Sequence, residues 1–369
     1  MKVMKGMKVL KVLSIVIALA GGLAAPAAPI IIDHKAVDAL ATVPDATLAR
    51  ASELSWFFSH ASVGENIMDG ITDWHTVNPG RYALTQQEYQ WPAPAPATTV
   101  PGVIYNHMWW NPGWQEKLNI LTTNVSTYWH APRANVVLAK FCYIDWTLDV
   151  DAYVAGIQAL EKAYPTTAFV YMTQATTTEP DRYEVMRANN NQKIRDWAAT
   201  NNVILFDVAD IESHTPDGQA ATFTFDGVSY PFLAAEYAAP GGGGHLVDTN
   251  NVGRDQAALG FYALTAALFT TDRNGDGLSD GDNLLAGTSP TATVSVTPAP
   301  PQIVSVVVTD IVAINGTGIP GQTYRIDKAR TLGTPWATLG SVVAGPSGTL
   351  SYQDTSPKES ESYYRLVVP

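Results

Sequence analysis

Short apolar runs alternate with longer amphipathic stretches between residues 54 and 269. The runs are almost continuously apolar, which is typical of parallel strands covered on both faces; they are LSWFF (54–58), NVVLAKFC (135–142), TAFVYMT (167–173) and NVILFDV (202–208). The stretch after the second run has helical spacing and places four apolar residues on one face: Tyr153, Ile157, Leu160 and Tyr164. This repeat of strand and helix predicts an α/β domain, a doubly wound parallel sheet with helices on both faces.

Residues 78–127 interrupt this rhythm with segments rich in proline and tryptophan, WPAPAPATTVPG and NHMWWNPGW. We interpret them as a long excursion over the sheet. Trp109 and Trp110 are candidates to bind substrate, because a flat indole face stacks well on a sugar ring. The alternative is that the tryptophans pack the excursion onto the domain.

The last part of the chain has a different pattern. Six short alternating segments lie between residues 303 and 369, separated by glycine, proline and asparagine, and they predict a small antiparallel β-sandwich. The segment GIPGQTYRIDKARTLGTPWATLG is similar to fibronectin-III-like modules of secreted bacterial enzymes. That resemblance implies attachment, for instance to a cell surface, or spacing.

The first 27 residues have the features of a secretory signal. They hold four lysines, an apolar run over residues 9–20 and small residues suited to cleavage. The run is shorter than the about 20 residues of a membrane span, and no later segment approaches that length. We therefore expect an exported protein, extracellular or periplasmic, without a transmembrane segment. The predicted units are the signal (1–27), the α/β domain (28–269), a loop and linker (270–302) and the β module (303–369).

Acidic residues outnumber basic ones, 34 to 22, and the formal net charge is −12. A surface of this sign repels phosphate backbones, so nucleic acid is not an expected partner. The single cysteine, Cys142, cannot form an internal disulfide, and its apolar neighbours favour a place in the core.

The segment TDRNGDGLSDGDN, residues 271–283, spaces oxygen donors as an EF-hand-type calcium loop does. The candidate ligands are Asp272, Asn274, Asp276, the Leu278 carbonyl, Asp280 and Asn283. The segment resembles the thrombospondin type 3 repeat, which implies structural Ca²⁺ and no cofactor for catalysis. The alternative is a solvated acidic turn.

Ser62 follows the first apolar run and precedes a helical pattern in FFSHASVGENIMDG. A serine at such a turn projects from the carboxyl edge of the sheet, where the helix N-terminus offers donors to a developing oxyanion. We predict that Ser62 is a nucleophile; the alternative is a helix N-cap.

His245 follows four glycines and precedes the last amphipathic helix. Gly241 to Gly244 would allow backbone angles closed to other residues and bring the imidazole to the serine as its base. An idle histidine in a surface loop is the alternative.

The order of these parts over residues 54–269 resembles the SGNH hydrolases, or GDSL-type esterases. The resemblance implies that Ser62 and His245 form the catalytic pair of a serine esterase. The acidic charge, the export signal, the tryptophan-rich segment and the β module then favour a secreted enzyme that acts on acyl esters, for example acetyl esters, of a carbohydrate or another small ester. The family's Gly-Asp-Ser reads His60-Ala61-Ser62 here, and its Asn-Asp pair falls near Asp145 in FCYID. Its Asp-x-x-His has Gly242 in place of the acid.

These departures leave several roles open. The third catalytic residue could be Asp248, Asp145 or Glu236, or a dyad could operate. Because an ionised Asp145 cannot donate a hydrogen bond, donors for the oxyanion would come from the Ser62 and Gly64 amides, the Asn66 side chain or Tyr143. His60 and Tyr143 are further candidates for substrate contacts, and a packing role for His60 is the alternative.

Two other functions fit the same residues. The chain could be a carbohydrate-binding protein on a degenerate hydrolase scaffold, because two supporting positions of the family are altered. It could also be a surface-display device in which the α/β domain is only structural.

Overall fold

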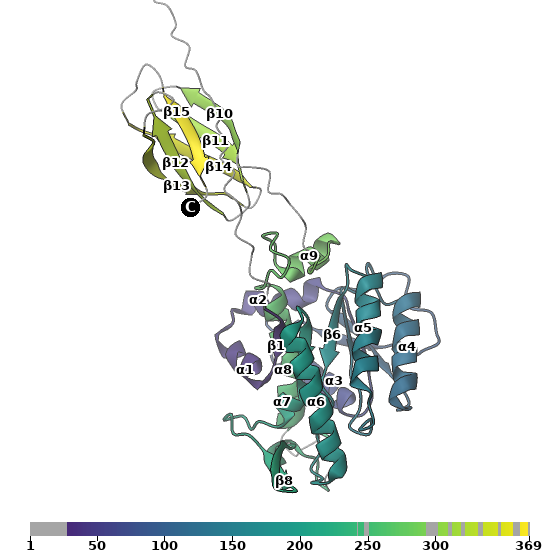
Figure 1. The fold of residues 1–369 in the computed structure, drawn as a ribbon. Helices are drawn as coiled ribbons and strands as arrows, with labels where there is room; N and C mark the ends of the chain where they lie inside the picture. Colours follow the sequence, from purple (N-terminus) through teal and green to yellow (C-terminus); the bar gives the residue numbers. More distant parts are fainter. Residues whose placement is uncertain are drawn as a thin grey trace, which may run out of the picture. The chain divides into compact units, whose positions relative to one another are not determined.

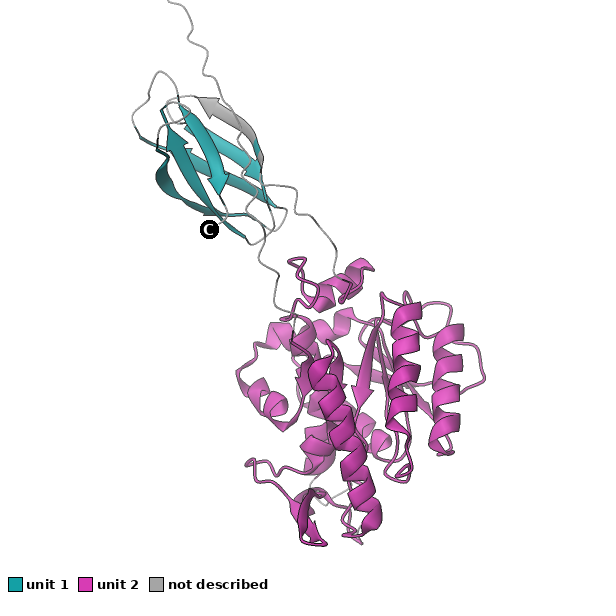
Figure 2. Ribbon diagram, in the orientation of Figure 1, with its two compact units in different colours: residues 1–25, 293–369 teal, residues 26–292 magenta. Residues whose placement is uncertain are grey.

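The chain divides into two compact units, one that spans residues 26–292 and one that contains residues 293–369 (Figure 2). The computed structural model describes residues 28–241, 243–246, 251–292, 302–308, 312–318, 322–330, 335–345, 348–356 and 362–367. The predicted signal, residues 1–27, lies outside the described residues. In the described part of the chain, no helix combines the length and the apolar composition that crossing a membrane requires.

A sheet forms the centre of the first unit (Figure 1). It has seven strands in the order β1-β7-β6-β5-β2-β4-β3. Every neighbouring pair is parallel, which confirms the predicted fold class. The strands are β1 (Ile30–Ile32), β2 (Trp56–His60), β3 (Thr85–Glu88), β4 (Val103–Met108), β5 (Val136–Ala139), β6 (Ala168–Met172) and β7 (Ile204–Phe206). β2 is buried along its whole length, because helices cover both faces of the sheet.

Two hydrophobic cores lie on the two faces of the sheet. Trp56 and Phe58 point into the first core, and Phe57 points into the second, as the two-residue period of a strand requires. The first core is covered by α1 (His34–Asp38), α2 (Asp45–Ala49), α3 (Val63–Val77), α7 (Val208–Glu212) and α8 (Val252–Leu268). The second is covered by α4 (Trp114–Thr127), α5 (Val150–Ala163) and α6 (Arg182–Thr200), which stand side by side in Figure 1.

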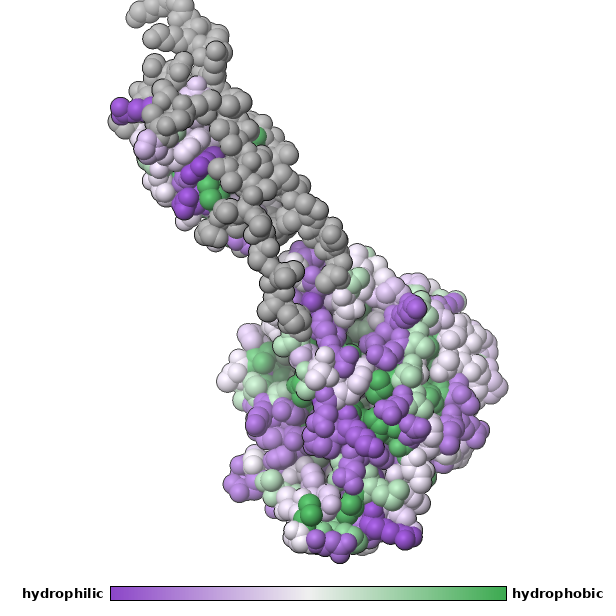
Figure 3. All heavy atoms as spheres, viewed as in Figure 1, coloured by the Kyte–Doolittle hydropathy of each residue, from purple (hydrophilic) through white to green (hydrophobic). Residues whose placement is uncertain are grey.

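The outer surface of these helices is mostly polar. Figure 3 shows the face over α6, where hydrophilic residues predominate and hydrophobic ones form small scattered areas. The N-cap of α6 is Asp181, whose carboxylate accepts hydrogen bonds from the amides of Tyr183 and Glu184. The helix is therefore specified by its cap and its buried side, while its outer side is free to be polar.

The proline- and tryptophan-rich segment differs from the prediction, because residues 78–127 contribute to the sheet. β4 lies between β2 and β3, with Trp56 opposite Ile104 and His60 opposite Met108. The short run VIYNHM has few purely aliphatic residues and stands next to irregular segments, so its strand character is weak in the sequence. As a result, the carboxyl ends of β2 and β4 are direct neighbours.

The first unit extends to residue 292, beyond the boundary at residue 269 suggested by the sequence. Helix α9 (Asp280–Ala286) packs onto it, and Leu284 is part of the first core. Asn135 donates a hydrogen bond to the Leu284 carbonyl at 3.1 Å, and Arg50 donates one to Asp282 at 2.7 Å. The acidic loop before α9 is therefore attached to the α/β domain.

The second unit contains the six predicted strands in two three-stranded antiparallel sheets, β10-β11-β14 and β13-β12-β15. The strands are β10 (Gln302–Val308), β11 (Val312–Thr317), β12 (Thr323–Ala329), β13 (Ala337–Val343), β14 (Thr349–Asp354) and β15 (Tyr363–Val367). Ile314, Ile326 and Tyr364 are buried in its own core, as in a small β-sandwich.

Candidate functional site

Ser62 occupies the tight turn between β2 and α3. Its backbone has φ 55° and ψ −111°, in a region that residues with a side chain rarely adopt. Ser62 is the N-cap residue of α3, yet its side chain makes no capping hydrogen bond. The N-cap interpretation therefore does not account for this serine, and the strained turn directs its hydroxyl elsewhere.

The hydroxyl of Ser62 meets His245, with Oγ 3.2 Å from Nε2. The histidine loop is held on both sides: the Ala239 amide donates to the His245 carbonyl at 2.9 Å, and the Leu246 amide donates to Oδ1 of Asn66 at 3.1 Å. Asn66 lies in the first turns of α3, so the helix that begins after Ser62 also holds the loop that carries its partner. Two segments 183 residues apart are thus fixed against each other.

The glycines before His245 have separate roles. Gly241 and Gly243 have φ values of 103° and 86°, which favour glycine. A Cβ on Gly244 would lie 2.8 Å from the Thr176 carbonyl oxygen and 2.7 Å from a ring carbon of Tyr143. This close approach requires a glycine. Gly242 lies outside the described residues.

A buried lysine lies beneath the pair. Lys140 follows β5 and is fully buried, and its Nζ donates to the Ala61 carbonyl at 3.3 Å, one residue before Ser62. Burial first, and then the Lys140 ammonium, hold the pKa of His245 below its usual value. Both effects favour the neutral imidazole, which is the form that accepts a proton.

The candidate third residues occupy different places. Asp145 is buried, pairs with Lys117 of α4 and accepts the Cys142 amide at 2.8 Å. Its contacts within the described part of the chain do not include His245. Glu236 is exposed in the short helix Ala235–Tyr237, and Asp248 lies outside the described residues.

The predicted oxyanion donors are only partly available. The Gly64 amide donates to the Ala61 carbonyl at 3.1 Å. Asn66 accepts the Leu246 amide through Oδ1, and this bond does not use its donor Nδ2. Tyr143 is half-buried and stands edge-on to His245, with ring centroids 6.0 Å apart. Burial is the largest cause that raises the pKa of Tyr143, and a hydrogen bond to Ser62 opposes it. Tyr143 therefore stays protonated at neutral pH and is able to donate.

His60 is corrected from a substrate contact to a packing residue, because its side chain is 0% exposed. Its ring stacks on Phe58 with centroids 4.8 Å apart, and a Cβ on Gly64 would lie 2.3 Å from its Cβ. Burial lowers its pKa to about 3. His60 thus forms the neutral base on which the first turn of α3 rests.

A tryptophan-lined groove of about 410 Å³ lies at the carboxyl end of β4. Its lining includes Trp91, Trp109, Trp110, His107, Glu88 and Glu116. Trp109 is 2% exposed, and its amide donates to the His60 carbonyl at 3.0 Å, whereas Trp110 is 97% exposed. Trp109 therefore serves mainly as packing, and Trp110 presents an open indole face beside the edge of the sheet that carries Ser62.

The acidic loop after α8 folds around its own side chains. Asp272 accepts the amides of Gly275 and Gly277 at 2.7 and 2.8 Å. Asp276 accepts from Asn274 at 3.0 Å and from Asn283 at 3.3 Å, and the Leu278 amide donates to it at 2.8 Å.

Asp280 differs from the other candidate calcium ligands. It is fully buried, pairs with the Arg273 guanidinium and accepts the Arg273 amide at 3.0 Å. Asp280 is therefore engaged with Arg273, and it would serve as a cation ligand only by leaving that guanidinium.

Sequence reasoning missed the two buried lysines. Lys117 and Lys140 are both 0% exposed. Lys140 stands inside the apolar run NVVLAKFC, where a charged residue within a buried strand pattern is a detectable signal. Lys117 lies in the first turn of an ordinary amphipathic helix, and nothing in its sequence surroundings marks it as the partner of Asp145.

No family model matches the chain, and no curated protein matches it. A solved structure from Streptococcus pneumonia that is named after platelet activating factor is 12% identical, with a TM-score of 0.34, and the match covers 61% of this chain and 90% of that one. An engineered protein is 11% identical, with a TM-score of 0.20, over 90% of this chain and 94% of its own. Similarities this low assign no function to the chain.

The pKa of His245 should depend on Lys140. Replacing Lys140 by Met removes the cation while keeping most of the volume, so the His245 pKa is expected to rise toward the usual value of about 6.5. Titration of the histidine ring signals by NMR, with His245→Gln for assignment, measures this. Lys162→Met on the exposed side of α5 is the control and should leave the pKa unchanged. An unshifted His245 in folded Lys140→Met would contradict the electrostatic role of Lys140.

The strain at Ser62 should be measurable as stability. Ser62→Gly and Ser62→Ala both remove the hydroxyl, but only glycine tolerates φ 55° and ψ −111° without strain. Strain of about 1–3 kcal/mol is partly offset by the greater freedom of glycine in the unfolded chain, about 0.4–1 kcal/mol. We expect the glycine variant to be the more stable by about 1 kcal/mol in urea unfolding. An alanine variant more stable than the glycine variant by about 0.4–1 kcal/mol, the difference expected from the freedom of glycine alone, would show that the turn is unstrained.

Proposed function

We propose that this protein is a serine ester hydrolase with Ser62 as nucleophile and His245 as general base. The observation that carries the proposal is the 3.2 Å contact between Ser62 Oγ and His245 Nε2, made by a serine in a strained turn whose side chain does not cap the helix. Strain at a residue that contacts a neutral imidazole supports a catalytic role rather than a structural one.

The reaction follows from these two side chains. His245 Nε2 takes the hydroxyl proton as Ser62 Oγ bonds to the ester carbonyl carbon, and the carbonyl oxygen becomes an oxyanion. When the bond to the leaving oxygen breaks, the imidazolium returns the proton to the departing alcohol. Water then attacks the acyl-serine, with His245 again as base, and releases the acid and free Ser62.

The oxyanion requires donors that the turn and its neighbours supply. We assign this role to the Ser62 amide and the Tyr143 hydroxyl, because the Gly64 amide is engaged in holding the turn. The side chain of Asn66 is a further candidate, because the bond from the Leu246 amide uses its acceptor Oδ1 and not its donor Nδ2. Arg187 donates to the Tyr143 carbonyl at 2.9 Å and so fixes the position of that residue. Asp248 is our proposed partner for the far nitrogen of His245; a dyad is the alternative.

The substrate class we propose is an acyl ester, such as an acetyl ester, carried by a carbohydrate. The supporting observation is the tryptophan-lined groove at the end of β4, the strand next to β2. The exposed Trp110 offers a flat apolar face to a sugar ring. We also propose that the enzyme is exported and attached to a surface through its β module. The signal-like residues 1–27 and the resemblance of the β module to fibronectin-III-like modules support this.

A fluorophosphonate probe tests the proposal directly, because it reacts with activated serines without knowledge of the substrate. The chain should be labelled at Ser62 and should hydrolyse p-nitrophenyl acetate. Ser62→Ala should lose labelling, and its turnover should fall by more than about a hundredfold. Ser126→Ala, an exposed serine of α4, is the matched control and should behave as the parent.

Two outcomes would count against the esterase. If folded parent protein is not labelled, a carbohydrate-binding protein on the same scaffold becomes the better interpretation, and glycan-array binding tests it. If Ser62→Ala retains full turnover, the hydrolysis occurs at another site.

We also propose that the loop of residues 272–283 binds Ca²⁺ and stiffens the end of the first unit. The spacing of the oxygen-bearing side chains supports this proposal, as do the bonds that hold Asn274 and Asn283 against Asp276. Calcium should raise the melting temperature, and Asp276→Asn should weaken the effect about tenfold in calcium concentration, while Asp196→Asn on the exposed side of α6 should not. Ester turnover should be nearly the same with calcium and with chelator. Identical melting curves with calcium and with EGTA would refute the calcium loop.

A further inference from the structure

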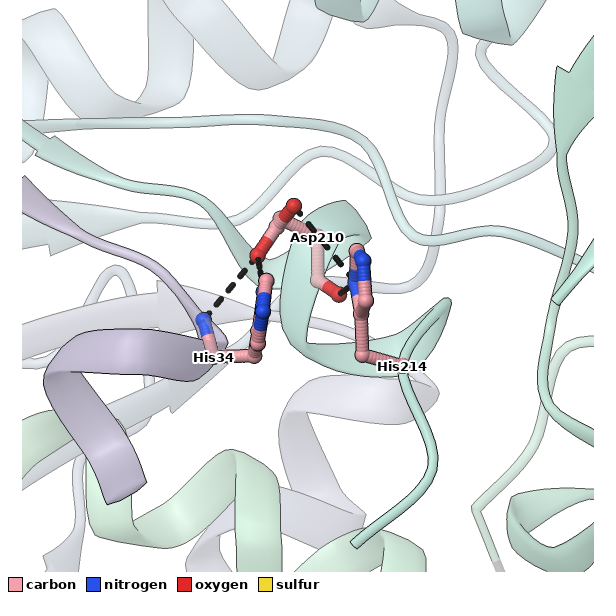
Figure 4. A group of neighbouring side chains, drawn as sticks. All are labelled: His34, Asp210 and His214. Atoms are coloured by element: carbon pink, nitrogen blue, oxygen red, sulfur yellow. Dashed lines mark hydrogen bonds and ion pairs between the residues drawn. The ribbon is translucent and has the colours of Figure 1, made fainter. Parts of the chain in front are cut away.

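A second cluster of chemically capable side chains lies on the β1 side of the same sheet. His34 begins α1, directly after β1, while Asp210 lies in α7 and His214 follows it, after β7. β1 and β7 are parallel neighbours, with Ile32 opposite Phe206, so their carboxyl ends meet. Figure 4 shows the two imidazoles on either side of the Asp210 carboxylate.

The three side chains converge closely. The His34 amide donates to Asp210 Oδ2 at 3.0 Å, and His34 Nδ1 contacts the same oxygen. His214 Nδ1 lies 2.8 Å from the Asp210 carbonyl oxygen and 3.5 Å from its Oδ1. One ligand atom of each residue lies within 4.8 Å of the others. The two rings are stacked, with centroids 3.6 Å apart.

We propose that His34, Asp210 and His214 bind a divalent transition-metal ion of the Zn²⁺ type. Two imidazoles and one carboxylate are a common ligand set for such ions, and three protein ligands leave a position for water. The imidazoles disfavour Ca²⁺ and Mg²⁺, which prefer oxygen. The side chains of His34, Asp210 and His214 are 16%, 22% and 18% exposed, so an ion and its water can reach them.

The backbone supports these ligands before any ion arrives. Asp33 caps α1 by accepting the Ala36 amide at 2.9 Å, and this holds His34 in the first turn. Asp207 accepts the Asp210 amide at 3.2 Å through Oδ1, and both of its oxygens accept hydrogen bonds from the Arg195 guanidinium, which holds α7. The backbone of the ligands is thus fixed in advance, which favours affinity. The two stacked rings would still turn about their side-chain bonds to place one ion in both ring planes.

The ion would connect two separate parts of the chain. β1 has three residues and lies at the edge of the sheet, paired only with β7 among the described strands. An ion shared by the residues after β1 and after β7 would fasten this short edge strand to its neighbour. The ion would then be structural, because its ligands are not among the contacts of Ser62 or His245.

The competing explanation is that the two imidazoles only hydrogen-bond to Asp210, His34 to its carboxylate and His214 to its backbone carbonyl. Metal binding separates these explanations, because a hydrogen-bonded cluster alone would show no stoichiometric uptake. The protein should be produced from residue 28 onward without a histidine tag, treated with chelator and titrated with ZnCl₂ by calorimetry.

We expect one Zn²⁺ per chain with a Kd in the micromolar range or tighter, and a rise in melting temperature of about 5 °C or more at a hundredfold excess over Kd. His34→Gln and His214→Gln should each weaken binding at least about tenfold. His75→Gln, at the end of α3, is the matched control and should bind as the parent does. Ser62 labelling should be unchanged in all three variants, which separates this site from the proposed hydrolase site.

Co²⁺ gives a second measurement that does not depend on the variants folding. The parent protein with one equivalent of Co²⁺ should show visible absorption bands of a nitrogen- and oxygen-ligated ion, and Zn²⁺ should displace them. Absence of stoichiometric Zn²⁺ binding by the folded parent would overturn the proposal. Equal binding by the parent and by folded His34→Gln and His214→Gln would overturn it as well.

Discussion

The tight passage from β2 into α3 is the constraint on which the site depends. Gly64 rests directly on the buried His60, and there is no room for a Cβ between them. Because the helix must start this close to the strand, Ser62 takes up the change of direction with a positive φ. The same strain turns its hydroxyl away from the helix and toward His245. A packing requirement and the placement of a nucleophile are therefore one feature of the backbone.

Several charged side chains are buried near the carboxyl edge of the sheet, and the cost of burying each charge is reduced in different ways. Glu184 pairs with Arg187, and Asp145 pairs with Lys117, so these charges are compensated. Glu212 has no such partner in the described part of the chain, and burial raises its pKa to about 8, so it is mostly neutral at pH 7. Its side chain accepts the Thr176 amide at 2.7 Å and thereby holds the loop on which Gly244 packs. These buried carboxyl groups, paired with a cation or neutral, hold the loops at the carboxyl edge of the sheet through their hydrogen bonds.

The sequence predicted the parts of the site that depend on local backbone order. The apolar run before Ser62 and the glycines before His245 indicate where each side chain leaves the fold, and both residues lie where this order places them. The place of Asp145 was not predictable from the sequence, because it depends on an ion pair with Lys117. Lys117 belongs to α4, a helix on the second core, and the sequence does not show that the two residues meet. The mixed composition of residues 103–108 concealed that they form a strand. The pairing of β4 with β2 was therefore not predicted either. His60 was ambiguous in sequence because only three-dimensional packing shows that Gly64 covers it.

The surroundings of His245 impose one further requirement on any reaction at Ser62. Burial and the Lys140 ammonium stabilise the neutral imidazole, which helps it to take the serine proton. The same two influences destabilise the imidazolium that forms next, so a hydrolase at this site needs a compensating negative charge near His245 in the transition state. Asp145 is held by Lys117, and Glu236 is exposed, so neither meets this need in the described structure. The oxyanion itself supplies part of that charge, because it develops beside the imidazolium. A carboxylate from residues 247–250, where Asp248 lies, would supply the rest.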